Sequence, residues 1–242
     1  MDRLTRRQLK QDEFRETFER FEDYLKQHYQ DIITVVVLTA AVVGLAAGLK
    51  AYVDRQEANA NADLAAALKT FRAYVGSAPA GELGAGAEAY PTEQAKYKKA
   101  LDEFNAIIQK YRIYPRPKAV SIARYHMGVC QALTGDRAGA LKTLEEASRD
   151  RDREIAALAR FALADDLARA GKLPEATKLY QDLADHPTLS VPRATALLAQ
   201  ADAYRAAQPA RARQIYQQVQ KEFGSDAMVA ETVKEQMSSL PQ

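Results

Sequence analysis

The sequence predicts an all-α chain in which one long apolar helix precedes a solenoid of helical hairpins. The first observation is the stretch between Asp31 and Lys50, where eighteen consecutive residues carry no charge although 27% of the chain is charged. The second is a pattern of small and aromatic residues that returns at intervals of 40, 36 and 36 residues. The third is a helical periodicity that runs, without a convincing strand, from the Gly-, Ala- and Pro-rich segment 78–93 to the end.

The uncharged run is long enough to cross a membrane. Eighteen helical residues extend about 27 Å, close to the roughly 30 Å hydrocarbon core of a bilayer. Tyr29 and Tyr52 flank the run, where aromatic rings favour the membrane interface. A core helix of a soluble protein shows a polar face at helical spacing, but here only Thr34 and Thr39 carry polar side chains. These features favour a transmembrane helix at 32–53.

A cleaved signal peptide is the other alternative, and the flanking residues argue against it. Signal peptides have a short basic leader and a small-residue cleavage site soon after the apolar core. Here the leader holds eight acids, and the site Ala58-Asn59-Ala60 lies beyond four charged residues. Lipoprotein processing is excluded because the only cysteine is Cys130. The run is therefore predicted to be a permanent anchor.

The distribution of basic residues predicts how the anchor is oriented. Seven Lys or Arg residues precede the span, whereas the twenty residues after Tyr52 carry three. Because basic residues are retained on the cytoplasmic side, we expect a cytoplasmic N-terminus. In a Gram-negative bacterium this is a single-pass inner-membrane protein whose C-terminal domain lies in the periplasm.

Two features of the N-terminal part are candidates for helix contacts. An apolar stripe at helical spacing marks the cytoplasmic segment, formed by Phe14, Phe18, Phe21 and Leu25. It fits a helix that leads into the span, lies on the membrane surface or docks on a partner. Within the span, Ala40, Gly44 and Gly48 place small residues on one stripe, which lets helix backbones approach closely. We predict a transmembrane helix contact at these three residues.

The second half of the chain repeats one pattern. An Ala, an aromatic or Leu residue four positions on, and a small or apolar residue three further on recur in Ala100-Phe104-Ile107, Ala140-Leu144-Ala147, Ala176-Tyr180-Leu183 and Ala212-Tyr216-Val219. A Gly- or Pro-containing turn precedes each of the last three, and the helix before the turn has a small residue at a matching place: Gly128, Ala164 and Ala201. Small residues let two helices pack closely, and such hairpins stack because none buries its apolar face alone.

The ends of the array are less regular. An irregular first hairpin pairs residues 61–75 with 96–115, and residues 225–240 read as a capping helix with Ser225 or Asp226 as its N-cap. The predicted organisation is a cytoplasmic amphipathic segment (1–31), a transmembrane helix (32–53), a helix with a Gly/Ala/Pro-rich linker (54–91), and a repeat domain with its C-terminal cap (92–242).

These hairpins resemble the tetratricopeptide repeat (TPR), whose period is 34 residues. The match rests on the small residue of the first helix and the Ala-aromatic pair of the second; the characteristic Trp is missing. In layout, the chain resembles the bacterial inner-membrane-anchored TPR family that includes the ancillary subunit of the Sec translocon (YfgM-like proteins). The resemblance implies an α-solenoid that binds translocon subunits and periplasmic chaperones.

The sequence offers no convincing catalytic or metal site. His126 and Cys130 stand one helical turn apart, but a zinc site needs three or four protein ligands; we interpret them as a helix-surface imidazole and a small buried thiol. Asp165-Asp166 and the 150–153 cluster have no accompanying nucleophile or phosphate loop, and are interpreted as solvated faces. A net charge of +2 gives no case for nucleic acid. We predict no enzyme activity, cofactor, metal or small-molecule substrate.

Function is predicted to lie in a groove along the first helices of the hairpins. By TPR spacing the inner positions are Tyr125, Phe161 and Leu198, then Val129, Asp165 and Asp202, with Arg124 and Arg160 flanking the first set. This mixture suits an extended polypeptide, unless Tyr125 and Phe161 are core between repeats. The leading hypothesis is a membrane-anchored scaffold for protein–protein interactions. The alternative is a constitutive structural subunit of another membrane complex, bound through its span.

Overall fold

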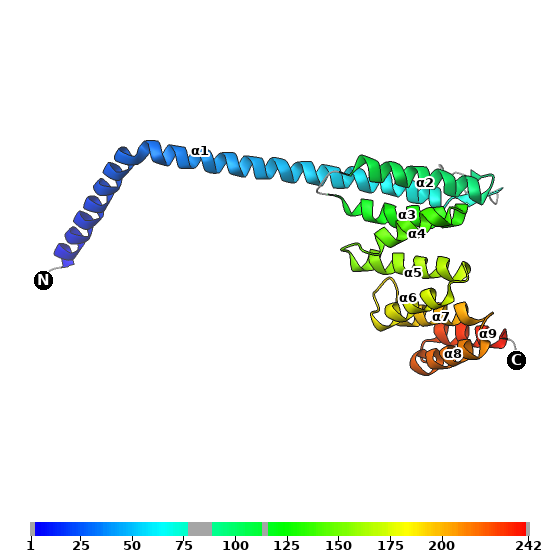
Figure 1. Ribbon diagram of the computed structural model, residues 1–242. Helices are drawn as coiled ribbons and strands as arrows, with labels where there is room; N and C mark the ends of the chain where they lie inside the picture. The colour runs from blue at the N-terminus through cyan, green and yellow to red at the C-terminus, as the bar shows by residue number, and fades with distance from the viewer. Residues whose placement is uncertain (1–2, 77–88, 113–115, 241–242) are drawn as a thin grey trace, which may run out of the picture. The chain divides into compact units, whose positions relative to one another are not determined.

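The computed structural model describes residues 3–76, 89–112 and 116–240 and confirms the all-α, TPR-like fold (Figure 1). The chain divides into two compact units, Met1–Arg55 and Gln56–Gln242. The central part of the predicted linker, residues 77–88, lies outside the described residues.

Helix α1 (Arg3–Phe71) begins in the first unit and continues into the second. The apolar part of this helix has a mean hydropathy of 2.6 and no buried residue, so it is long and apolar enough to cross a membrane. The hydroxyls of Thr34 and Thr39 donate to carbonyls one turn earlier, both at 2.7 Å. These bonds leave no polar hydroxyl unsatisfied on the apolar surface.

A local break separates the N-terminal part of α1 from the apolar part. His28 has non-helical backbone angles, with φ −113° and ψ 15°, and its Nδ1 lies 3.2 Å from the Tyr24 carbonyl oxygen. The side chains of Phe14, Phe18 and Phe21, on which the predicted apolar stripe rests, lie outside the described residues.

The second unit is a stack of helical hairpins. After the parallel pair β1 (Tyr74–Val75) and β2 (Ala89–Tyr90), its helices are α2 (Glu93–Lys110), α3 (Lys118–Thr134), α4 (Arg137–Ala147), α5 (Arg153–Arg169), α6 (Leu173–Asp185), α7 (Arg193–Tyr204), α8 (Pro209–Phe223) and α9 (Ala227–Ser238). Each of these helices packs on the next in chain order, as Figure 1 shows. The first helices of successive hairpins, α3, α5 and α7, also contact one another directly. They therefore line one side of the stack.

The repeated positions form the core of this unit. All four pattern alanines are fully buried, and the aromatic or Leu residues that follow them are at most 1% exposed: Phe104, Leu144, Tyr180 and Tyr216. The last turns of α1 take part as well, because Ala60, Leu64 and Ala67 share one buried cluster with Phe104. The end of α1 and α2 thus form the irregular first hairpin.

Glycine and aspartate set the ends of the helices. Gly135 and Gly171 adopt φ of +91° and +76°, a backbone conformation in which glycine ends a helix without strain. Asp226 rather than Ser225 caps α9, since its carboxylate accepts hydrogen bonds from the backbone N–H groups of Met228 and Val229 at 2.9 and 3.3 Å.

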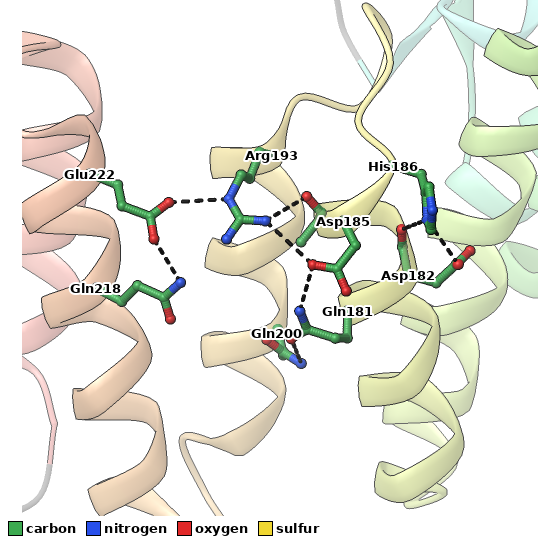
Figure 2. Close-up of polar contacts among 9 residues, drawn as sticks. Gln181, Asp182, Asp185, His186, Arg193, Gln200, Gln218 and Glu222 are labelled. Carbon is green, nitrogen blue, oxygen red and sulfur yellow. Dashed lines mark hydrogen bonds and ion pairs between the residues drawn. The ribbon is translucent and has the colours of Figure 1, made fainter.

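Arg193, at the start of α7, ties three helices together (Figure 2). Its guanidinium donates to the Ala184 carbonyl of α6 at 2.7 Å and to the Glu222 carboxylate of α8 at 3.1 Å, with Asp185 at 3.5 Å. The Arg193 side chain is 32% exposed, so the ion pairs are only partly screened by water. This contact fixes how the last two hairpins meet.

We expect Gly128→Ala to destabilise the repeat unit. A Cβ at this position would lie 2.8 Å from Leu144 Cγ and Cδ2, and 3.3 Å from the Leu144 backbone nitrogen. Overpacking costs about 1–3 kcal/mol, more than the roughly 0.5–1 kcal/mol that Ala gains over Gly inside a helix. Chemical unfolding of the full-length chain, followed by circular dichroism, measures the difference. Adding Leu144→Val should recover part of the loss, whereas a single variant as stable as the parent would contradict this packing.

Candidate partner-binding groove

Residues of α3 and α5, together with Leu144 of α4, line one hollow of about 230 Å³. Its lining comprises Tyr125, Val129, Ala132, Leu133, Leu144, Phe161, Ala162, Asp165, Asp166 and Arg169. Four residues of the predicted groove are therefore brought together here: Tyr125, Val129, Phe161 and Asp165. The other four predicted residues, Arg124, Arg160, Leu198 and Asp202, lie outside this lining. The volume is below the roughly 300–1,000 Å³ typical of small-molecule sites, and suits a single side chain.

Phe161 is both a wall of the hollow and part of the core between repeats. It packs against two buried clusters, and its ring meets the edge of the Tyr180 ring with centroids 5.6 Å apart. Leu198 also packs against one of these two clusters, the one that contains Tyr216. Tyr125 is half-buried; its burial, and next the charge of Asp165, raise its pKa, so the phenol stays protonated and can donate a hydrogen bond.

The two groove aspartates have partners within their own hairpins. The Tyr180 hydroxyl donates to Asp165, and the Tyr216 hydroxyl donates to Asp202. Burial and these carboxylates raise the pKa of both tyrosines above the ordinary value, which keeps them hydrogen-bond donors. In the α3/α4 hairpin the corresponding residues are both apolar, Val129 and Leu144. The first helix of a hairpin thus has an aspartate at this position only where the second helix has a tyrosine to donate a hydrogen bond to it.

The flanking arginines differ in their surroundings. Arg160 Nη1 donates to Asp182 of α6 at 3.0 Å, so its charge is used within the α5/α6 hairpin. Asp182 also lies 3.2 Å from the His186 ring (Figure 2). Arg124 is half-buried on α3.

The prediction of a solvated face at Asp165-Asp166 was wrong for Asp166. Asp166 is 6% exposed, and its Oδ2 is buried with no partner among the residues that the structure describes. The spacing carried a signal for this, because Asp166 follows the buried residues Ile155 and Ala159 of α5 by eleven and seven residues, which places it on the same helix face.

The 150–153 cluster also has a structural role that the sequence reasoning missed. Asp152 caps α5 by accepting from the backbone N–H groups of Glu154 and Ile155, and it pairs with Lys118 of α3 at 2.6 Å. The signal was an Asp immediately before the first turn of a predicted helix.

The prediction from the sequence that the imidazole of His126 lies on the helix surface was wrong. Its ring stacks on Phe104 with centroids 5.2 Å apart, and Nδ1 is buried with no partner in the described part of the chain. Burial, with the nearby charge of Arg72, lowers the pKa of His126 to about 4. Cys130 is fully buried, and burial raises the pKa of its thiol to about 12. Within residues 3–76, 89–112 and 116–240, no three His, Cys, Asp or Glu residues are placed to hold a metal.

Comparison with known protein families supports the repeat architecture for one hairpin, that of α7 and α8. Residues 195–225, which include most of α7 and all of α8, match the tetratricopeptide repeat family. Repeats of this family typically bind other proteins or peptides. No curated protein and no solved structure gives a significant match to the chain.

We expect Tyr180→Phe to destabilise the protein more than Tyr216→Phe. Either change removes the hydroxyl that satisfies an aspartate, and hydrogen bonds to charged groups contribute about 1.5–3 kcal/mol. The Asp202 side chain is 48% exposed and has Arg205 3.6 Å away, so water and this cation replace part of the lost bond. Asp165 is less exposed. Unfolding midpoints of the two full-length variants give the comparison, and an equal or larger loss for Tyr216→Phe would contradict it.

The buried imidazole of His126 makes the free energy of unfolding depend on pH. The folded-state pKa of His126, about 4, is below its ordinary value of 6.5, so the unfolded chain binds more protons between these pH values. The free energy of unfolding should therefore fall as the pH is lowered from about 6.5 to 4, by roughly 2–3 kcal/mol. In His126→Phe, which keeps a ring against Phe104, this part of the pH dependence should disappear. Identical pH profiles of parent and variant would exclude His126 as its source.

Proposed function

We propose that this chain is a membrane-anchored TPR scaffold that binds segments of partner proteins in the groove along α3, α5 and α7. The observation that carries the proposal is the shared hollow, to which two successive repeats contribute Tyr125, Val129, Phe161 and Asp165. Apolar walls with a few polar groups suit an extended polypeptide, which places one side chain at a time in a cavity of this size.

The proposed location is the inner membrane of a Gram-negative bacterium, with the repeats in the periplasm. Residues 32–53 would cross the membrane once, with the N-terminus in the cytoplasm. The excess of Lys and Arg before the span supports this orientation. The high mean hydropathy of the apolar part of α1, and the absence of buried residues from it, support a lipid surrounding.

The proposed partners are subunits of the Sec translocon and periplasmic chaperones, or a client chain that leaves the translocon. This choice rests on the resemblance in layout to YfgM-like proteins. An anchored repeat array suits it physically, because tethering raises the effective concentration of a groove near the membrane and compensates for weak individual contacts.

A structural subunit that associates through its span is the second candidate. A side chain added at Gly44 or Gly48 would meet no atom within 4 Å in this chain. The stripe formed with Ala40 is therefore open to a second transmembrane helix.

Two sets of substitutions distinguish the candidates. Tyr125→Ala with Leu133→Ser alters the groove at half-buried or exposed positions and leaves the core residue Phe161 in place. Gly44→Leu with Gly48→Leu fills the stripe and keeps the span apolar. Tagged full-length chains are extracted in mild detergent, and the amount of each bound partner is quantified by mass spectrometry. We expect the amount of bound partner to fall at least ten-fold for the groove variant and to stay unchanged for the span variant.

Leu189→Ser is the matched control, since Leu189 is 93% exposed in the α6–α7 loop and is not part of the groove. The control should keep the partners of the parent chain. If only the span variant loses partners, while the groove variant is folded by circular dichroism, the groove does not bind and the scaffold proposal fails.

A further inference from the structure

The wall of the hollow contains a carboxylate, that of Asp166, to which no described residue of the fold donates a hydrogen bond. Asp166 is more than nine-tenths buried, and its Oδ2 has no hydrogen-bond partner among the described residues. A buried carboxylate oxygen without a partner is costly, because it has lost its hydrogen bonds to water and no protein group replaces them. Its neighbour Asp165 differs, since it accepts a hydrogen bond from Tyr180. Asp166 thus brings to the wall of this cavity a carboxylate with no hydrogen-bond partner among the described residues.

The charges around the hollow do not balance. Asp165, Asp166 and Arg169 are its ionisable residues apart from Tyr125. Two carboxylates and one guanidinium leave a formal charge of −1. Arg169 is exposed, and within the described part of the chain no ion pair joins it to either aspartate. The interior of the cavity can therefore accept a further cation or hydrogen-bond donor.

The remaining walls are apolar and define the shape of the occupant. Val129, Leu133, Leu144 and Phe161 line the cavity around the carboxylate. A side chain that fits must combine an apolar stem with a terminal donor. Lysine and arginine have this build, since their methylene groups cover apolar surface while the charged end reaches a polar partner.

We propose that the hollow between α3 and α5 takes a lysine or arginine side chain of the bound polypeptide, with Asp166 as its counter-ion. The stem lies against Val129, Leu133 and Phe161, and the cationic end pairs with the carboxylate of Asp166. This inference rests on the proposed function, because it names what the groove selects in a partner segment. The inference adds one requirement to the proposed function: the partner segment must contain a lysine or arginine residue that can enter the hollow.

Peptides that differ in one side chain test the proposal. The probes are nine-residue Ala/Ser peptides with lysine, arginine, norleucine or glutamate at the centre; norleucine has an apolar stem and no ammonium group. They are titrated into the full-length chain in an uncharged detergent, with Leu and Val methyl groups labelled for NMR. We expect the lysine and arginine peptides to shift the methyl signals of Val129, Leu133 and Leu144, and to bind at least ten-fold more tightly than the norleucine peptide. The glutamate peptide should bind no better than norleucine.

The variant Asp166→Asn tests the counter-ion. It should reduce the affinity for the lysine peptide at least ten-fold, to the level of norleucine, while the unfolding midpoint stays equal or rises because an unpaired buried charge has been removed. The matched control is Asp102→Asn, the same chemical change at an exposed position of α2, which should leave binding unchanged.

Three results would overturn the proposal. They are a norleucine peptide that binds as tightly as the lysine peptide, an Asp166→Asn chain that still prefers lysine, and shifts confined to methyl groups outside the hollow. The first comparison needs no substitution and so remains decisive if Asp166→Asn fails to fold. Failure here is separable from failure of the scaffold: if Asp166→Asn keeps every partner that the Tyr125→Ala/Leu133→Ser chain loses, the groove binds but does not select a basic residue.

Discussion

The close approach of the two helices in each hairpin is the constraint on which the repeat unit depends. Gly128 touches Leu144 with no room for a Cβ, and Ala164 and Ala201 occupy the matching places in the next two hairpins. The close contact between the two helices buries the aromatic or Leu residue that follows each pattern alanine by four positions. Because each hairpin is narrow, the first helices α3, α5 and α7 reach one another along one side. The hollow between α3 and α5 is a consequence of this spacing.

Polar contacts decide what the inner side of the stack can offer to a partner. Asp165 and Asp202 look like groove charges by position, but each is held by a tyrosine of its own hairpin. Arg160 is held by Asp182 in the same manner. The charges that repeat most regularly therefore stabilise the hairpins. The residue that departs from this rule is Asp166, which is buried without a partner at the point where two repeats meet.

Much of the fold could be predicted from the sequence because it depends on local spacing. The Ala and aromatic positions, the glycine turns and the apolar run of α1 are short-range patterns, and the structure places them as helix contacts, helix ends and an exposed apolar helix. The environment of His126 could not be predicted, because it depends on Phe71 and Phe104 from two other helices. The partners of the groove aspartates were missed for a related reason: they lie fifteen and fourteen residues away, across a turn whose geometry cannot be read from local spacing.

Asp166 shows how stability and binding can conflict in a small repeat array. An apolar residue at this place on α5 would fill the wall of the hollow without an unpaired charge, and replacement of a buried charge by an apolar residue is often stabilising. Natural proteins deviate from such rules mainly where a site requires it. A carboxylate that the free chain leaves unsatisfied can gain its full interaction only in the complex, so it favours a donor over an apolar isostere more strongly than a solvated acid would. The same buried position therefore lowers the stability of the free protein and sharpens its choice of partner.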